Sequence, residues 1–184
     1  MKDPRETLLS WLNDAYSMER GQIQVLENHV NDVRDKNPEA FQKLAEHLEK
    51  TRMHADRVEQ CVARLGGSTS SVKTAMGTIA GFFQGRSTGA APDELVKNAL
   101  SDYAAEHFEI ACYRALIAGA RALGQNEVVQ ICEEILRDEE DMARWLERQL
   151  PLMVQEYLGQ TAAAGVNAGN YNPGTGNPGG VTRF

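Results

Sequence analysis

The segment Tyr103–Tyr113 constrains the fold most, because it places two carboxylates, Glu106 and Glu109, one helical turn apart within an apolar helical pattern. At 3.6 residues per turn, Glu106 shares one stripe with apolar and aromatic side chains: Ala99, Tyr103, Ile110, Tyr113 and Ile117. An ionised carboxylate without a partner on a buried face costs several kcal/mol or takes up a proton. The rest of the chain must therefore supply cations, a metal ion or water to this segment.

The first half of the chain predicts a helical hairpin. Asp3-Pro4 and Asn37-Pro38 each combine a capping side chain with a proline suited to the first helical position. Apolar residues then follow at helical spacing, first to about Lys36 and then to Leu65, where Gly66-Gly67 stops the second helix.

The second half predicts another hairpin after a long crossover. The crossover, Ser68 to Gly89, contains one expected short helix at Val72–Phe83. A third helix starts at Pro92-Asp93-Glu94 and ends at Leu123-Gly124, and a fourth follows Gln125-Asn126 and continues, kinked at Pro151, to Leu158.

Two helical hairpins joined by one long crossover are the ferritin-like arrangement among four-helix bundles. The sequence therefore predicts an all-α, ferritin-like four-helix bundle over residues 1–158. Residues 159–184 form a Gly/Asn/Pro-rich C-terminal tail, which should be disordered on its own.

The other predicted helices also carry acids at middle depth. Tyr16-x-x-Glu19 repeats the spacing of Tyr103-x-x-Glu106, as a duplicated hairpin would. Glu49 on the second helix and Glu139 on the fourth complete a set drawn from all four helices: Glu19, Glu49, Glu106, Glu109 and Glu139. Clustered carboxylates in a bundle bind iron or manganese pairs, because hard oxygen ligands bridge the two cations and offset their charge. We therefore expect these acids to be metal ligands, with Glu109 bridging.

Several segments resemble the YciE/YciF group of bacterial ferritin-like proteins over about residues 5–150. They are Asp14-Ala-Tyr-Ser-Met-Glu-Arg20, His47-Leu-Glu-Lys-Thr51, Glu106-His-Phe-Glu-Ile-Ala-Cys-Tyr113, Leu123-Gly124 and Ile135-Leu-Arg-Asp-Glu139. The resemblance implies a ferritin-like bundle, a dinuclear metal centre and an association with stress responses. Beside such a centre, the candidates for redox or supporting roles are Tyr16, Tyr103 and Tyr113.

The chain departs from this family's pattern at two places. Where the family's second helix usually has Glu-x-x-His, this chain has Glu49-Lys-Thr-Arg52, and Met142 and Ala143 follow Glu139 where relatives carry a further His or acid. His54 lies about 140° around the helix from Glu49, so we expect it at the surface. The dinuclear site is then incomplete, or Arg52 bridges Glu49 and a facing Glu in a metal-free core.

Composition excludes several classes of function. A net charge of −7 without a basic stripe argues against nonspecific nucleic-acid binding and against binding to anionic membranes. Cys61, Cys112 and Cys132 have no paired spacing, which indicates reduced, buried thiols in a cytoplasmic protein. From its charged first residues and its lack of a long apolar run, we expect neither a signal peptide nor a membrane-spanning segment.

Two hypotheses of function follow. The first is a stress-related oxidoreductase with a carboxylate-bound iron or manganese centre that oxidises Fe(II) or detoxifies peroxide. The alternative is a noncatalytic bundle, metal-free or metal-degenerate, that acts through self-assembly or partner binding. In either case we expect a homo-oligomer, with a dimer favoured and the tail docked on a neighbouring subunit.

Overall fold

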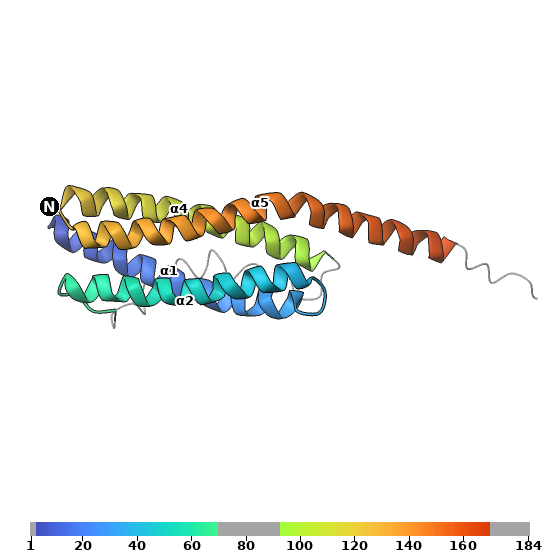
Figure 1. Cartoon of the computed structure of the whole chain (residues 1–184), viewed down its shortest axis with the longest axis horizontal. Helices are drawn as coiled ribbons and strands as arrows, with labels where there is room; N and C mark the ends of the chain where they lie inside the picture. The colour runs from blue at the N-terminus through green and yellow to red at the C-terminus, as the bar shows by residue number, and fades with distance from the viewer. Residues whose placement is uncertain (1–2, 70–92, 170–184) are drawn as a thin grey trace, which may run out of the picture.

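Four α-helices make up the described part of the computed structural model, which covers residues 3–69 and 93–169, with side chains as far as residue 162. They are α1 (Pro4–Val33), α2 (Pro38–Arg64), α4 (Glu94–Ala122) and α5 (Asn126–Gly169). Figure 1 shows two hairpins, α1 with α2 and α4 with α5, packed side by side. The predicted ferritin-like four-helix bundle is confirmed. The expected short helix Val72–Phe83 lies outside the described residues.

Local sequence explains where the helices begin and end. The Asp3 carboxylate accepts a hydrogen bond from the Arg5 amide at 2.9 Å, and the Asn37 side chain accepts one from the Ala40 amide at 3.0 Å. Gly66 and Gly124 follow α2 and α4 with φ of 83° and 66°, a backbone conformation that favours glycine. The helix limits predicted from caps, prolines and glycines are thus met within a few residues.

Helix α5 is longer than predicted. It has 44 residues, continues through Pro151 and ends at Gly169 rather than near Leu158. Three consecutive alanines follow Thr161, and alanine has the highest helix propensity, so this stretch favours a helix more than its glycines suggest. In Figure 1, α5 projects beyond the rest of the bundle. None of the helices in the described ranges combines the length and apolarity needed to cross a bilayer.

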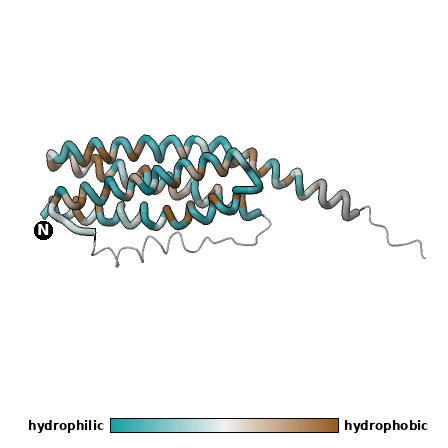
Figure 2. The backbone as a smooth tube through the Cα atoms, turned by 60° about the horizontal axis from the view of Figure 1, so that its bottom comes forward, coloured by the Kyte–Doolittle hydropathy of each residue, from teal (hydrophilic) through white to brown (hydrophobic). Residues whose placement is uncertain are grey.

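The core consists of two apolar clusters with polar side chains between them. The first cluster includes Met18 and Ile135, and the second includes Ile23 and Met142. Figure 2 shows hydrophilic and hydrophobic residues alternating along each helix, as expected where one face of each helix is buried. Because Glu19 follows Met18 and Glu139 lies between Ile135 and Met142, both acids fall at the boundary between the clusters.

A buried polar pair joins α1 to α4 away from this boundary. His29 Nδ1 lies 2.7 Å from Asp102 Oδ1, and both side chains are buried. Burial lowers the pKa of His29, but the hydrogen bond and charge of Asp102 outweigh it, so the pKa is raised above its ordinary value.

We expect His29→Gln to destabilise the protein more at about pH 5 than at about pH 9. A raised folded-state pKa stabilises fully below the unfolded value of about 6.5, and this contribution is lost as the pH rises through the folded value. Because the variant leaves the Asp102 carboxylate buried without its charged partner, the free energy of unfolding at about pH 5 should fall by about 3 kcal/mol. Urea unfolding at both pH values measures it. An equal loss at both would contradict the charged pair.

Candidate metal centre

Four of the five predicted acids lie buried at the boundary between the apolar clusters. Glu19 comes from α1, Glu106 and Glu109 come from α4, and Glu139 comes from α5, and none is more than 1% exposed. Glu139 interacts electrostatically with each of the other three. The fold therefore brings together the acids that the apolar stripes indicated.

Glu49 is the exception, and its predicted position in the core is wrong. Its side chain is 66% exposed and forms an ion pair with Arg52, whose guanidinium also binds Glu27 at 2.8 Å. Glu49 lies about 140° around α2 from the buried Leu44, which turns it toward solvent. Arg52 does bridge Glu49 and a facing Glu, but at the surface, so it does not neutralise the buried acids.

Two histidines of α2 take the place expected for Glu49. His47 and His54 are 3% and 1% exposed, so the expectation that His54 lies at the surface is wrong. Seven residues are nearly two helical turns, which puts both rings on one face. His54 does lie about 140° around α2 from Glu49, but Glu49 is the residue that faces solvent, so His54 faces the core. The sequence signal for both histidines is the apolar face of α2, which they share with Leu44, Leu48, Ala55 and Val58.

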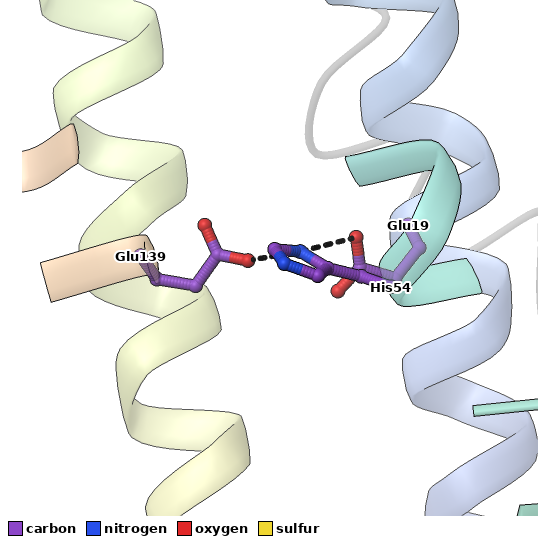
Figure 3. Close-up of side chains that lie close together, drawn as sticks. All are labelled: Glu19, His54 and Glu139. Carbon is purple, nitrogen blue, oxygen red and sulfur yellow. Dashed lines mark ion pairs between the residues drawn. The ribbon is translucent and has the colours of Figure 1, made fainter. Parts of the chain in front are cut away.

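The first group of candidate ligands is Glu19, His54 and Glu139, from three different helices. His54 Nδ1 lies 2.9 Å from Glu139 Oε1 and 3.8 Å from Glu19 Oε2. Figure 3 shows the imidazole between the two carboxylates, which approach from opposite sides. One donor atom from each residue lies within 4.8 Å of the others, so a single cation between them could contact all three.

The second group is His47, Glu106 and Glu139, with the same 4.8 Å limit on the separation of their donor atoms. His47 Nε2 lies 3.1 Å from Glu106 Oε1 and 3.5 Å from Glu139 Oε2. Glu139 therefore belongs to both groups and offers a different oxygen to each histidine. Glu109, which the sequence suggested as the bridge, belongs to neither group.

The pKa values of the acids reflect burial first. Burial and the charge of Glu139 raise the pKa of Glu19 to about 8 and raise those of Glu106 and Glu109 well above the ordinary range. Burial acts in the same direction on Glu139, but the hydrogen bond of His54 and the charges of His47 and His54 lower its pKa. Even with both imidazoles protonated, four carboxylates would exceed the cations by two charges, so the site favours protons or metal cations.

Polar contacts outside the cluster hold His54. Its Nε2 lies 3.2 Å from Asp138 Oδ2, and Lys50 donates to the other oxygen of Asp138 at 3.0 Å. With a metal ion bound, a proton on Nε2 shared with Asp138 would leave the lone pair of Nδ1 free to bind it. Histidine ligands of metals are commonly oriented by such a carboxylate.

The three candidate tyrosines differ in their relation to the acids. Tyr113 is fully buried and its hydroxyl donates to Glu19 Oε1. Tyr16 is partly buried and packs against both apolar clusters. Tyr103 is partly buried, and its ring packs edge-on against the His107 ring with 4.5 Å between the ring centroids. Within the described residues, Tyr113 is thus the tyrosine that contacts a cluster acid.

The donor set fits a pair of divalent cations. Apart from the ion-pair contacts given above, several buried atoms of the cluster make no well-aligned hydrogen bond in the described structure, namely Glu19 Oε2, His47 Nε2, His54 Nδ1, both oxygens of Glu106, Glu109 Oε1 and Glu139 Oε2. Buried polar atoms without well-aligned hydrogen bonds are costly, and a cation shared among them would remove that cost. Carboxylate oxygens with imidazole nitrogens suit iron and manganese. Met142 and Ala143, buried beside Glu139, add no such donor.

Comparison with known proteins agrees with the fold and the resemblance. Residues 3–159 match the model of DUF892, a domain of unknown function. The crystal structure of a protein from Xanthomonas campestris is 33% identical over 87% of this chain and 99% of that chain, with a TM-score of 0.73.

Two more distant structures share the fold. The Escherichia coli stress protein YciF is 22% identical, with a TM-score of 0.68 over 84% of this chain and 99% of its own. A Desulfovibrio desulfuricans bacterioferritin described with a diiron site is 20% identical, with a TM-score of 0.69 over 98% of this chain and 100% of its own. The match along residues 3–159 places this chain in the DUF892 family, and the chain shares its ferritin-like fold with YciF and the bacterioferritin.

Proposed function

We propose that this protein binds a dinuclear iron or manganese centre and uses it to oxidise Fe(II) or consume peroxide under stress. The observation that carries the proposal is the pair of buried donor groups that share Glu139. The diiron site described for the bacterioferritin supplies the analogy for the metal. The description of YciF as a stress protein supplies the analogy for a role under stress. The three free cysteines accord with a cytoplasmic location.

In this scheme Glu19, His47, His54, Glu106 and Glu139 would hold the metal ions, and Glu139 would serve both of them. A bound pair of iron or manganese ions would supply one-electron redox chemistry. Tyr113 donates to one oxygen of Glu19, which leaves the other oxygen for a cation. Asp138 fixes the orientation of His54, and the surrounding apolar clusters exclude bulk water from the acids.

Protein purified without chelator and supplied with Fe(II) or Mn(II) should retain two ions per chain. We expect the Fe(II)-loaded protein to oxidise further Fe(II) when hydrogen peroxide or air is admitted. Elemental analysis measures the stoichiometry, and a chromogenic Fe(II) chelator follows the loss of Fe(II). The control is protein heated until the bundle unfolds. Failure of the folded chain to retain either metal at saturating concentration would refute the proposal.

The projecting end of α5 favours a second function, self-assembly into a homo-oligomer. Leu152 and Leu158, in the last part of α5, are 55% and 58% exposed, so this part of the helix offers apolar side chains that a partner could cover. We propose that the oligomer is a dimer. Arg52 pairs with Glu27 and Glu49 at the surface and does not neutralise the buried acids. The buried acids therefore remain available to metal ions whether or not the protein assembles.

A further inference from the structure

Gln22 is a fully buried amide beside the candidate metal centre. It is 0% exposed, lies on α1 three residues after Glu19, and has no hydrogen-bond partner for either Oε1 or Nε2 among the described residues. An apolar side chain of similar size would avoid the desolvation cost of an unpaired amide. A buried polar group that destabilises the fold commonly serves a site.

The register of α1 against α4 places Gln22 level with Glu109. Contacts from Glu19 to Tyr113 and from His29 to Asp102 show that the helices run antiparallel. Gln22 lies three residues after Glu19, and Glu109 lies four residues before Tyr113. At about 1.5 Å per residue these steps carry both residues to the same level within about 2 Å.

Glu109 also has an unused polar atom. It is 1% exposed, its Oε1 has no partner in the described structure, and it interacts electrostatically with Glu19 and Glu139. It nevertheless belongs to neither group of candidate ligands. Gln22 and Glu109 are therefore two buried polar side chains at the same level on α1 and α4, whereas the histidines come from α2.

We propose that Gln22 and Glu109 bind a small oxygen-containing ligand of the centre, of the class of water, hydroxide or hydrogen peroxide. An amide is suited to this because it both donates and accepts a hydrogen bond without adding charge to a site rich in acids. The carboxyl group of Glu109 supplies the second contact. This inference rests on the proposed function, since the ligand would lie beside the bound metal.

The test uses azide as the small anionic probe and Co(II) as the spectroscopic metal. Gln22→Met should bind Co(II) with wild-type stoichiometry but bind azide at least about tenfold more weakly, because a hydrogen-bonding group is lost from a buried site. The exposed Gln24 on the same helix provides the matched control, Gln24→Met, which should leave azide binding unchanged. Visible absorption of Co(II) reports both stoichiometry and azide affinity.

Two further measurements keep the inference testable. Glu109→Leu should also weaken azide binding while retaining Co(II). Gln22→Met should raise the melting temperature of the metal-free protein by a few degrees, because it removes an unpaired amide. Normal Co(II) loading with unchanged azide affinity in both variants would overturn this inference alone. A wild-type protein that binds no Co(II) would overturn the proposed function as well.

Discussion

Glu139→Ala should weaken the binding of both metal ions by at least about 100-fold, whereas Glu49→Ala should leave their affinity unchanged. Glu139 is the residue common to the two donor groups, and each of its oxygens faces a different histidine. Loss of an outer-sphere partner typically costs 10–100-fold in metal affinity, so loss of a shared ligand should cost at least about 100-fold. Calorimetric titration with Mn(II) or Fe(II), with elemental analysis, measures the effect.

The control is well matched because Glu49 is a glutamate of the same bundle at the same depth along its axis, but on the exposed face of α2. Circular dichroism should show the same helix content for both variants. His47 and His54 each belong to one group only, so His47→Ala and His54→Ala should each weaken the binding of one ion more than that of the other. Two ions retained by Glu139→Ala with wild-type affinity would contradict the assigned bridge.

Metal removal should lower the melting temperature by roughly 10 °C or more. Each ion held at a concentration well above its dissociation constant contributes about 3–4 kcal/mol, and a chain of this length shifts by about 2–4 °C for each kcal/mol. Without metal, only protons and the imidazoles of His47 and His54 can neutralise the buried carboxylates. Differential scanning calorimetry of loaded protein and of protein stripped with a chelator measures the difference.

The two forms should also respond to pH in opposite directions. In the metal-free protein, the raised pKa of Glu19 stabilises fully below about pH 4.5, and this contribution is lost as the pH rises through about 8. The raised values of Glu106 and Glu109 act in the same direction. Metal binding requires deprotonated ligands, so the loaded form should gain stability over the same interval. Parallel pH dependences would show that the acids do not exchange protons for metal.

The fold was accessible from the sequence because its signals are local. Caps at Asp3 and Asn37 and glycines at 66 and 124 mark helix ends, and these depend on only a few neighbouring residues. The buried acids of α1, α4 and α5 were accessible for a related reason, since Glu19, Glu106 and Glu139 lie on stripes of apolar residues and Glu109 flanks one of them.

The contribution of α2 was predicted incorrectly because Glu49 was chosen by its residue type and by resemblance. The hydrophobic face of α2 passes through His47, Thr51 and His54, all buried, and Glu49 lies well away from it. Which oxygen faces which histidine, and the role of Asp138 in orienting His54, depend on the packing of α2 against α5. Such contacts between helices distant in sequence leave no periodic signal within either helix.

The shared position of Glu139 has a consequence for how such a centre would fill. A carboxylate that serves two cations is fixed in position by the first to arrive, so the second would find part of its coordination already prepared. The two binding events are then coupled, and by reciprocity each ion strengthens the retention of the other. Loading would rise steeply over a narrow range of metal concentration, and the chain would spend little time holding a single ion.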